Sequence, residues 1–318
     1  MKNRTLFIIA AVIIFSAAML AQVISHRQAG GPVAGARSIK VVATIFPLYD
    51  MARAIGGGHA DVTLLLPPGV EAHSFEPKPG DIARINEADI FIYTGKFMEP
   101  WAEDIIGGVA NKGLLVVNAG NEVKLTREAG PARGKQEAAP DPHIWLDFDN
   151  AKTMAGNISR AFEAEDPANG EAYRRASIAY EGGLSALDAA YKSGLSLCRT
   201  KEIIYGGHYA FGYLARRYDL KYMAAQGLSP DSEPTAKDLS ALVEQIKRDK
   251  VKFIFYEELT SPKIAETIAA ETGAKMLPLS AAHNVGRDEI KRGISFFDIL
   301  RSDLVNLRTG LECGGSSK

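Results

Sequence analysis

Residues 141–147 read Asp-Pro-His-Ile-Trp-Leu-Asp and stand between two stretches in which short apolar runs alternate with helical patterns. Four strands are expected before this segment, near residues 39–45, 61–66, 90–94 and 114–118. Four more are expected after it, near residues 203–205, 221–224, 251–256 and 275–279. Such alternation is typical of parallel sheets covered by helices on both faces. The sequence therefore predicts an α/β fold with two lobes, each a mostly parallel four-stranded sheet flanked by helices.

The longest helical pattern covers residues 170–192. Alanine and leucine recur in it near helical spacing, at Ala172, Ala176, Ala179, Leu184, Leu187 and Ala190. At 1.5 Å per residue this helix is about 30 Å long or more, which is enough to run between two lobes. We therefore expect an N-terminal lobe at 39–168, a connecting helix at 169–197 and a C-terminal lobe at 198–318.

The N-terminus has the character of an export signal. Lys2 and Arg4 precede an uncharged apolar stretch that runs from Leu6 to Ile24. The same stretch is long enough to stay in a bilayer as an anchor. We expect a signal peptide or N-terminal anchor at 1–25, a linker rich in Gly, Ala and Pro at 26–38, and a periplasmic or otherwise extracytoplasmic location.

Charge and cysteine content narrow the function further. The chain has 318 residues and a formal net charge of −1, so it offers no basic field for nucleic acid. Its two cysteines, Cys198 and Cys313, form a disulfide or remain two free thiols, because exported proteins allow either. Sequence leaves both alternatives open, since it does not give the distance between the two residues.

Four of the six histidines follow predicted strands, and those four are His73, His143, His208 and His283. Open α/β sheets bind ligands beyond the carboxyl ends of their strands, so two histidines from each lobe fall on the binding side. His59 precedes a strand and His26 lies in the linker, so neither fits. The placement predicts a metal site in a cleft between the two lobes.

The chemistry of four imidazoles favours a bound metal ion over a packed core, and two alternatives stay open. Four imidazoles without a counter-charge repel one another when protonated and need partners when neutral, whereas a divalent cation satisfies all four. No pair shows the local His-x-x-x-His spacing, so four unrelated surface histidines remain the alternative. Carboxylates that follow strands also compete for the site, namely Glu71, Glu76, Asp147, Glu257 and Glu258. Asp147 has a second role open to it, as the cap of the helix beginning near Asn150.

Four motifs carry a resemblance to a known family. They are Thr-Ile-Phe-Pro-Leu at 44–48, His-Ser-Phe-Glu-Pro at 73–77, Asp-Pro-His-Ile-Trp-Leu-Asp at 141–147 and Gly-Gly-His-Tyr-Ala-Phe-Gly-Tyr-Leu-Ala-Arg-Arg-Tyr at 206–218. With these motifs in this order, residues 38–312 resemble the metal-binding periplasmic receptors of bacterial ABC importers, the ZnuA/TroA type of solute-binding protein.

The resemblance implies two lobes joined by one long rigid helix, with one metal between them held by His73, His143 and His208. The fourth ligand of the family is usually Asp or Glu in the segment matching residues 279–284. That segment has no carboxylate here, and we assign His283 as the fourth ligand. Nitrogen ligands favour Zn²⁺ over Mn²⁺, which prefers carboxylate oxygen. The histidine-rich loop of many zinc-binding relatives is absent from residues 121–140.

The expected function is therefore capture of Zn²⁺ outside the cytoplasm and delivery to the permease and ATPase of an ABC importer. We expect a monomer with no catalytic residues and no nucleic-acid partner. Two alternatives are kept. One is a manganese receptor of the same type, and the other is a zinc-dependent hydrolase that uses Glu257 or Glu258 as general base.

Overall fold

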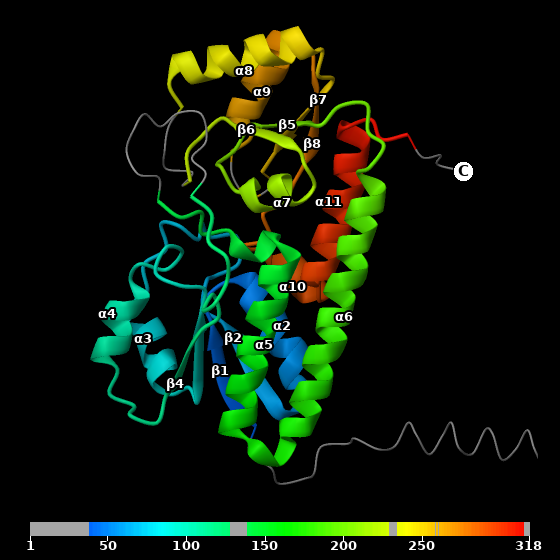
Figure 1. The fold of residues 1–318 in the computed structure, drawn as a ribbon. Coiled ribbons are helices and arrows are strands. Elements are labelled where there is room, and N and C mark those ends of the chain that lie inside the picture. Colours follow the sequence, from blue (N-terminus) through cyan, green and yellow to red (C-terminus); the bar gives the residue numbers. More distant parts are fainter. Residues whose placement is uncertain (1–37, 128–138, 229–233, 258, 260, 315–318) are drawn as a thin grey trace, which may run out of the picture. The chain divides into compact units, whose positions relative to one another are not determined.

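The first four strands form one parallel sheet in the order β2-β1-β3-β4. This sheet, coloured from blue to cyan, lies in the lower half of Figure 1. The strands are β1 (Ile39–Ala43), β2 (Ala60–Leu64), β3 (Ile90–Tyr93) and β4 (Leu115–Asn118). The computed structural model describes residues 38–127, 139–228, 234–257, 259 and 261–314. Strand β3, Ile-Phe-Ile-Tyr, is one of the two inner strands and is buried along its whole length, as a parallel strand covered on both faces must be.

Alternate residues of this sheet pack on opposite faces. Val41 and Ile92 join the main core together with α2 (Phe46–Gly56) and α5 (Phe148–Glu165). Val42 and Phe91 face the other way, toward α3 (Pro79–Asn86) and α4 (Ala102–Gly108). Three short 3₁₀ turns complete this lobe, at Gly57–His59, Ile144–Leu146 and Pro167–Asn169.

The second sheet repeats the arrangement of the first, in the order β6-β5-β7-β8 and again with all strands parallel. Its strands are β5 (Glu202–Tyr205), β6 (Lys221–Ala224), β7 (Phe253–Tyr256) and β8 (Lys275–Pro278). The helices between them are α7 (Gly212–Arg217), α8 (Ala236–Asp249) and α9 (Lys263–Thr272). The predicted fold class, two lobes with parallel four-stranded sheets, is confirmed.

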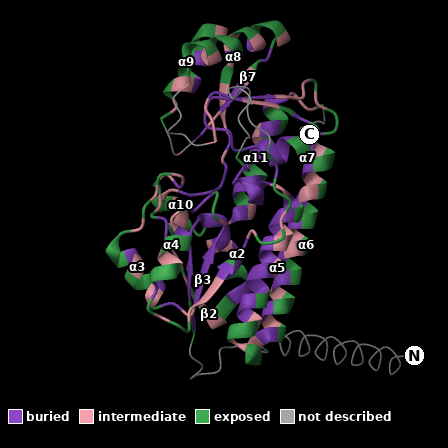
Figure 2. Ribbon diagram, turned by 60° about the vertical axis from the view of Figure 1, so that its left-hand side comes forward, coloured by how far each residue is buried: buried purple, intermediate pink, exposed green. Residues whose placement is uncertain are grey.

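The predicted long helix is α6 (Gly170–Gly194), whose 25 residues span about 37 Å. It packs against α5 and α2 of the first lobe and against α11 (Phe296–Gly310). A Cβ added to Gly183 would meet the Phe297 ring, and one added to Gly194 would meet Leu304 and Arg308. The two helices therefore run side by side in the same direction, with their buried sides inward in Figure 2.

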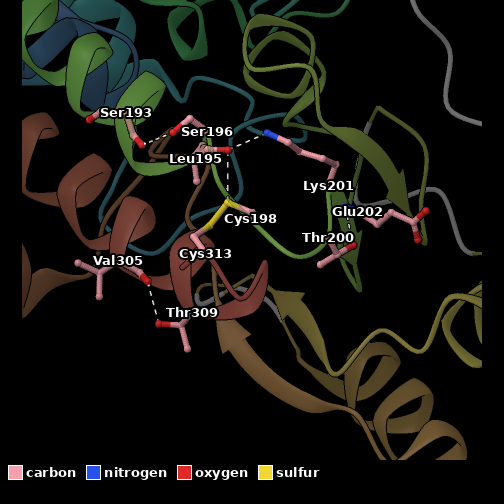
Figure 3. Close-up of a disulfide and its surroundings, with 10 residues drawn as sticks. All are labelled: Ser193, Leu195, Ser196, Cys198, Thr200, Lys201, Glu202, Val305, Thr309 and Cys313. Atoms are coloured by element: carbon pink, nitrogen blue, oxygen red, sulfur yellow. Dashed lines mark hydrogen bonds between the residues drawn. A yellow bond between two sulfur atoms is a disulfide. The ribbon is translucent and has the colours of Figure 1, made fainter. Parts of the chain in front are cut away.

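The two cysteines are paired. Cys198 lies four residues after the end of α6, and Cys313 lies three residues after the end of α11. Their disulfide joins these two helix ends beside the start of β5 (Figure 3). Of the two alternatives that the sequence left open, the structure therefore shows the disulfide.

Two helices have features of their own. The helix α3 begins at Pro79, and Asp81 occupies its third position, where its carboxylate accepts a hydrogen bond from the Lys78 amide. The helix α10 (Arg287–Arg292) was not expected, because it is short and almost wholly charged. The predicted signal or anchor at 1–25 and the predicted linker at 26–38, apart from Ser38, lie outside the described residues. No helix among those described is long and apolar enough to cross a membrane.

Candidate metal centre

The four predicted histidines meet between the two lobes. His73 lies in the loop after β2, His143 after β4, His208 after β5 and His283 after β8. His143 Nε2 lies 3.1 Å from His73 Nε2 and 3.1 Å from His208 Nε2. The His283 ring centroid is 5.6 Å from that of His208 and 6.1 Å from that of His73. All four histidines thus lie together beyond the carboxyl ends of strands, where open α/β sheets bind ligands.

The remaining histidines lie elsewhere. His59 contacts Tyr173 of α6, with ring centroids 5.9 Å apart, and is not part of this cluster. His26 lies outside the described residues. The alternative of four unrelated surface histidines is wrong, because His143 and His208 are fully buried and His283 is only 3% exposed. His73 is the half-buried member, so solvent reaches the cluster on its side.

The spacing of the nitrogens suits a metal ion. In a tetrahedral site with Zn–N bonds of about 2.0–2.1 Å, ligand nitrogens lie about 3.3 Å apart. The ligand atoms of His73, His143 and His208 lie within 4.8 Å of one another, as do those of His208, Glu257 and His283. The four histidines and one carboxylate thus form two overlapping groups that share His208.

Buried carboxylates orient two of the imidazoles. Asp141 Oδ1 lies 2.7 Å from His143 Nδ1 and also accepts from the His143 amide at 3.0 Å. Glu257 Oε2 lies 2.9 Å from His208 Nδ1. Because a carboxylate accepts only from a protonated nitrogen, each contact places the ring proton on Nδ1 and leaves the Nε2 lone pair facing the cluster.

His283 is held differently. Its Nε2 lies 3.6 Å from Glu257 Oε1 and 3.9 Å from Glu71 Oε2. Its Nδ1 has no hydrogen-bond partner in the described part of the chain, and neither has Glu257 Oε1. Unlike His143 and His208, it therefore has no carboxylate fixing its tautomer.

Burial and charge set the protonation of the cluster. Burial, followed by the neighbouring imidazoles, lowers the pKa of His73 and of His143 well below the ordinary value. Burial alone would also lower the pKa of His208, but the Glu257 carboxylate outweighs it and raises that pKa. Most of the cluster is thus neutral near pH 7, which is the form that ligates metals.

The other competing carboxylates have separate roles or positions. Asp147 is the N-cap of α5, where its Oδ1 accepts from the amides of Asp149 and Asn150, so its capping alternative is confirmed. Glu71 Oε1 accepts from the His73 amide at 2.9 Å. Glu76 is exposed, and Glu258 lies outside the described residues.

Sequence reasoning missed the orienting role of Asp141 and Glu257. Asp141 stood within the quoted motif, two residues before His143, and this short spacing was the available signal. Glu257 was considered only as a competing ligand or general base. Its partner is 49 residues away in sequence, so only the fold brings the two together.

Comparison with known proteins gives consistent results. A family model described as zinc-uptake complex component A, periplasmic, matches residues 41–310. The high-affinity zinc uptake system protein ZnuA of Bacillus subtilis is 35% identical over 280 residues, covering 86% of this chain and 88% of that protein. The zinc-binding protein AdcA of Streptococcus pyogenes is 30% identical over 99% of this chain, which spans 63% of AdcA. The crystal structure of the Zn(II)-bound ZnuA-like domain of Streptococcus pneumoniae AdcA aligns with a TM-score of 0.75 at 31% identity, covering 87% of this chain and all of that domain.

Proposed function

The chain belongs to the periplasmic zinc-uptake complex component A family, and on that premise we propose that it binds one Zn²⁺ through His73, His143, His208 and His283. Proteins of this family are solute-binding receptors of zinc importers rather than enzymes. The hydrolase alternative is therefore set aside. Zn²⁺ is the cargo of this chain, captured outside the cytoplasm for delivery to an ABC importer.

The observation that carries the ligand set is the geometry of three nitrogens. His73, His143 and His208 point their Nε2 atoms at one another with 3.1 Å between neighbours. The two fully buried rings each have Nδ1 fixed by a carboxylate, which is the usual way that proteins orient metal-binding histidines. The ligands come from both lobes, so a bound ion ties the lobes together.

His283 is our proposed fourth ligand. Its ring is buried beside His208, and its Nε2 lies 3.6 Å from Glu257 Oε1, beyond hydrogen-bond distance, so this contact does not hold the nitrogen away from a metal ion. Four protein ligands leave no place for a reactive water, which suits binding and transport. An all-nitrogen set also favours Zn²⁺ over Mn²⁺. Mn²⁺ remains the second candidate because Glu257 Oε1, 3.6 Å from His283 Nε2, offers an oxygen.

The chain's partners and anchoring follow from the same proposal. We propose that it acts as a monomer and docks on the permease of an importer whose ATPase drives transport. We further propose that residues 1–25 direct export and either are cleaved or tether the receptor to the membrane. We also propose that the N-terminal lobe covers residues 39–168, the connecting helix residues 169–197 and the C-terminal lobe residues 198–318.

Zinc titration of His143→Ala tests the site. We expect the zinc dissociation constant to rise by more than about 100-fold. Loss of a residue that only hydrogen-bonds to a metal ligand weakens binding by about 10–100-fold, and His143→Ala removes a ligand itself. His59→Ala is the matched control, because it removes a histidine outside the cluster. An unchanged zinc affinity in His143→Ala would refute the proposed site.

X-ray absorption tests the fourth ligand. The zinc-loaded protein should show four nitrogen neighbours at about 2.0–2.1 Å, and His283→Ala should lose one of them along with affinity. If His283→Ala binds zinc as tightly as the unmodified protein, the fourth ligand is instead Glu257, Glu71 or water.

A further inference from the structure

The segment that carries His283 belongs to the second lobe in sequence but is bonded to the first lobe in space. It follows β8, and its residues 281–285 are almost fully buried. The His283 carbonyl accepts from the Phe46 amide at 3.1 Å, and the Val285 carbonyl accepts from the Gly69 amide at 3.0 Å. The Ala281 carbonyl accepts from Trp145 Nε1 at 2.7 Å. The two lobes therefore meet along this segment, beside the histidine cluster.

Asn284 makes the side-chain part of this contact. Its Nδ2 donates to the Pro67 carbonyl at 2.9 Å and to the Val70 carbonyl at 2.6 Å. Its Oδ1 accepts from the Val285 amide at 2.8 Å. All of its amide groups are thus used, and both donors reach across to the loop of the first lobe that leads to His73.

The residue type matters at this position. Only an amide side chain of this size supplies two donors and an acceptor together, since Asp has no donor and Leu has neither. Asn284 is 1% exposed, so water reaches its amide only if residues 281–285 move away from the 67–70 loop. A buried amide without partners is costly, and this cost favours the state in which the segment and the loop stay in contact.

The 281–285 segment and the 67–70 loop each contain a residue with a positive φ. Ala282, beside His283, has φ of +59°, which is uncommon for a residue with a side chain. Gly69, in the middle of the loop, has φ of +82°. Glycine adopts this conformation without strain, whereas Ala282 does not, and the carbonyls on either side of Ala282 are bonded to Trp145 and to Phe46 of the first lobe.

We propose that Asn284 is a positioning residue for metal capture, which holds the 67–70 loop, and through it His73, in register with His208 and His283. This proposal rests on the proposed function of the cluster. Asn284 touches neither the metal nor an imidazole in this role. Its effect reaches His73 through Glu71 and Ala72, the two residues between Val70 and His73, and reaches His283 as the next residue in the chain.

The chain offers a matched control in Asn157. Asn157 Nδ2 also donates to two backbone carbonyls, those of Ala119 and Asn121, both at 2.9 Å. It is 7% exposed, and its two bonds stay within the first lobe. Asn157→Ala therefore removes the same kind and number of bonds as Asn284→Ala without breaking a contact between lobes.

The test compares zinc affinity in the full chain carrying Asn284→Ala or Asn157→Ala. We expect Asn284→Ala to raise the zinc dissociation constant by about 10- to 100-fold, as loss of an outer partner does at other sites. Zinc release to an excess of chelator should accelerate in parallel. Asn157→Ala should lower the unfolding midpoint but leave zinc affinity within about twofold. Equal weakening by both variants would show a general loss of stability and would overturn the proposal.

Hydrogen exchange of the metal-free protein separates this proposal from the proposed function. Exchange at the Gly69 and Phe46 amides should accelerate in Asn284→Ala and not in Asn157→Ala, because these amides bond the segment that Asn284 holds. Unchanged exchange at both amides would overturn the proposal even if zinc binds. If the unmodified chain fails to bind zinc, the proposed function fails, while exchange at Gly69 still decides whether Asn284 holds the loop.

Discussion

Arg217 links three parts of the molecule, and its replacement by Ala has a cost that can be worked out from its contacts. Its guanidinium binds Asp188 of α6 through two nitrogens, at 2.8 and 2.7 Å. It also donates to Asp147 at 3.1 Å and to Asp149 at 2.9 Å, at the start of α5. The second lobe is thereby tied to the connecting helix and to the end of the Asp-Pro-His segment.

Exposure decides how much each contact contributes. The side chains of Arg217, Asp188 and Asp147 are 18%, 24% and 15% exposed, whereas Asp149 is 68% exposed and adds little. Hydrogen bonds to charged groups in such partly buried places contribute about 1.5–3 kcal/mol each. The two carboxylates left behind keep other donors, Tyr218 for Asp188 and backbone amides for Asp147. The bonds of one guanidinium do not add, because they share the same group, so we expect Arg217→Ala to lower the free energy of unfolding by about 2–3 kcal/mol, near the value of a single such bond.

Urea unfolding followed by circular dichroism measures this change, provided that the slopes of the two transitions agree. Arg174→Ala is the control, because Arg174 also binds two carboxylates, those of Glu163 and Glu171, but is 55% exposed. The control should unfold like the unmodified protein. A loss in Arg217→Ala no greater than in Arg174→Ala would refute the argument that burial makes this network matter.

Two further predictions concern zinc. Glu257→Gln should weaken zinc binding by about 10- to 100-fold, because the carboxylate that orients His208 is replaced by a neutral amide. Competition with a coloured chelator measures the zinc dissociation constant. An unchanged dissociation constant would contradict the orienting role of Glu257. Zinc affinity should also fall as the pH is lowered, because the raised pKa of His208 means that a proton must leave its ring, while His73 and His143, with lowered pKa values, stay neutral longer. Each proton displaced lowers the zinc affinity about tenfold per pH unit below the pKa of the group that carries it. Calorimetry should therefore show zinc affinity falling from about pH 8 to about pH 5. An affinity that does not change over this range would argue against imidazole ligands.

Local patterns in the sequence were sufficient to predict the strands and the side of each sheet where the site lies. Apolar runs such as Ile-Phe-Ile-Tyr at 90–93 are typical of buried parallel strands, and the histidines follow such runs. The order of strands within each sheet was beyond reach, because pairing joins segments far apart in the chain. The helix α10 was missed because its sequence, Arg-Asp-Glu-Ile-Lys-Arg, has no apolar period to detect.

The sequence indicated which histidines gather in the cluster, but not which residues support them. Residue type and strand position suggested the four histidines. The roles of Glu257 and Asn284 depend on partners 49 and more than 200 residues away, and no spacing in the sequence reports such distances. The crossing of residues 281–285 to the first lobe was unexpected for the same reason, since the segment follows a strand of the second lobe.

The disulfide changes how the two lobes can move. A lobe attached through a single helix can rotate about the axis of that helix. The second lobe is instead attached through two packed helices, α6 and α11, and the disulfide between Cys198 and Cys313 joins their ends covalently. Swivelling of the second lobe would have to shear one helix along the other, against packing such as Phe297 on Gly183. Any rotation of the second lobe about α6 therefore has to carry α11 with it.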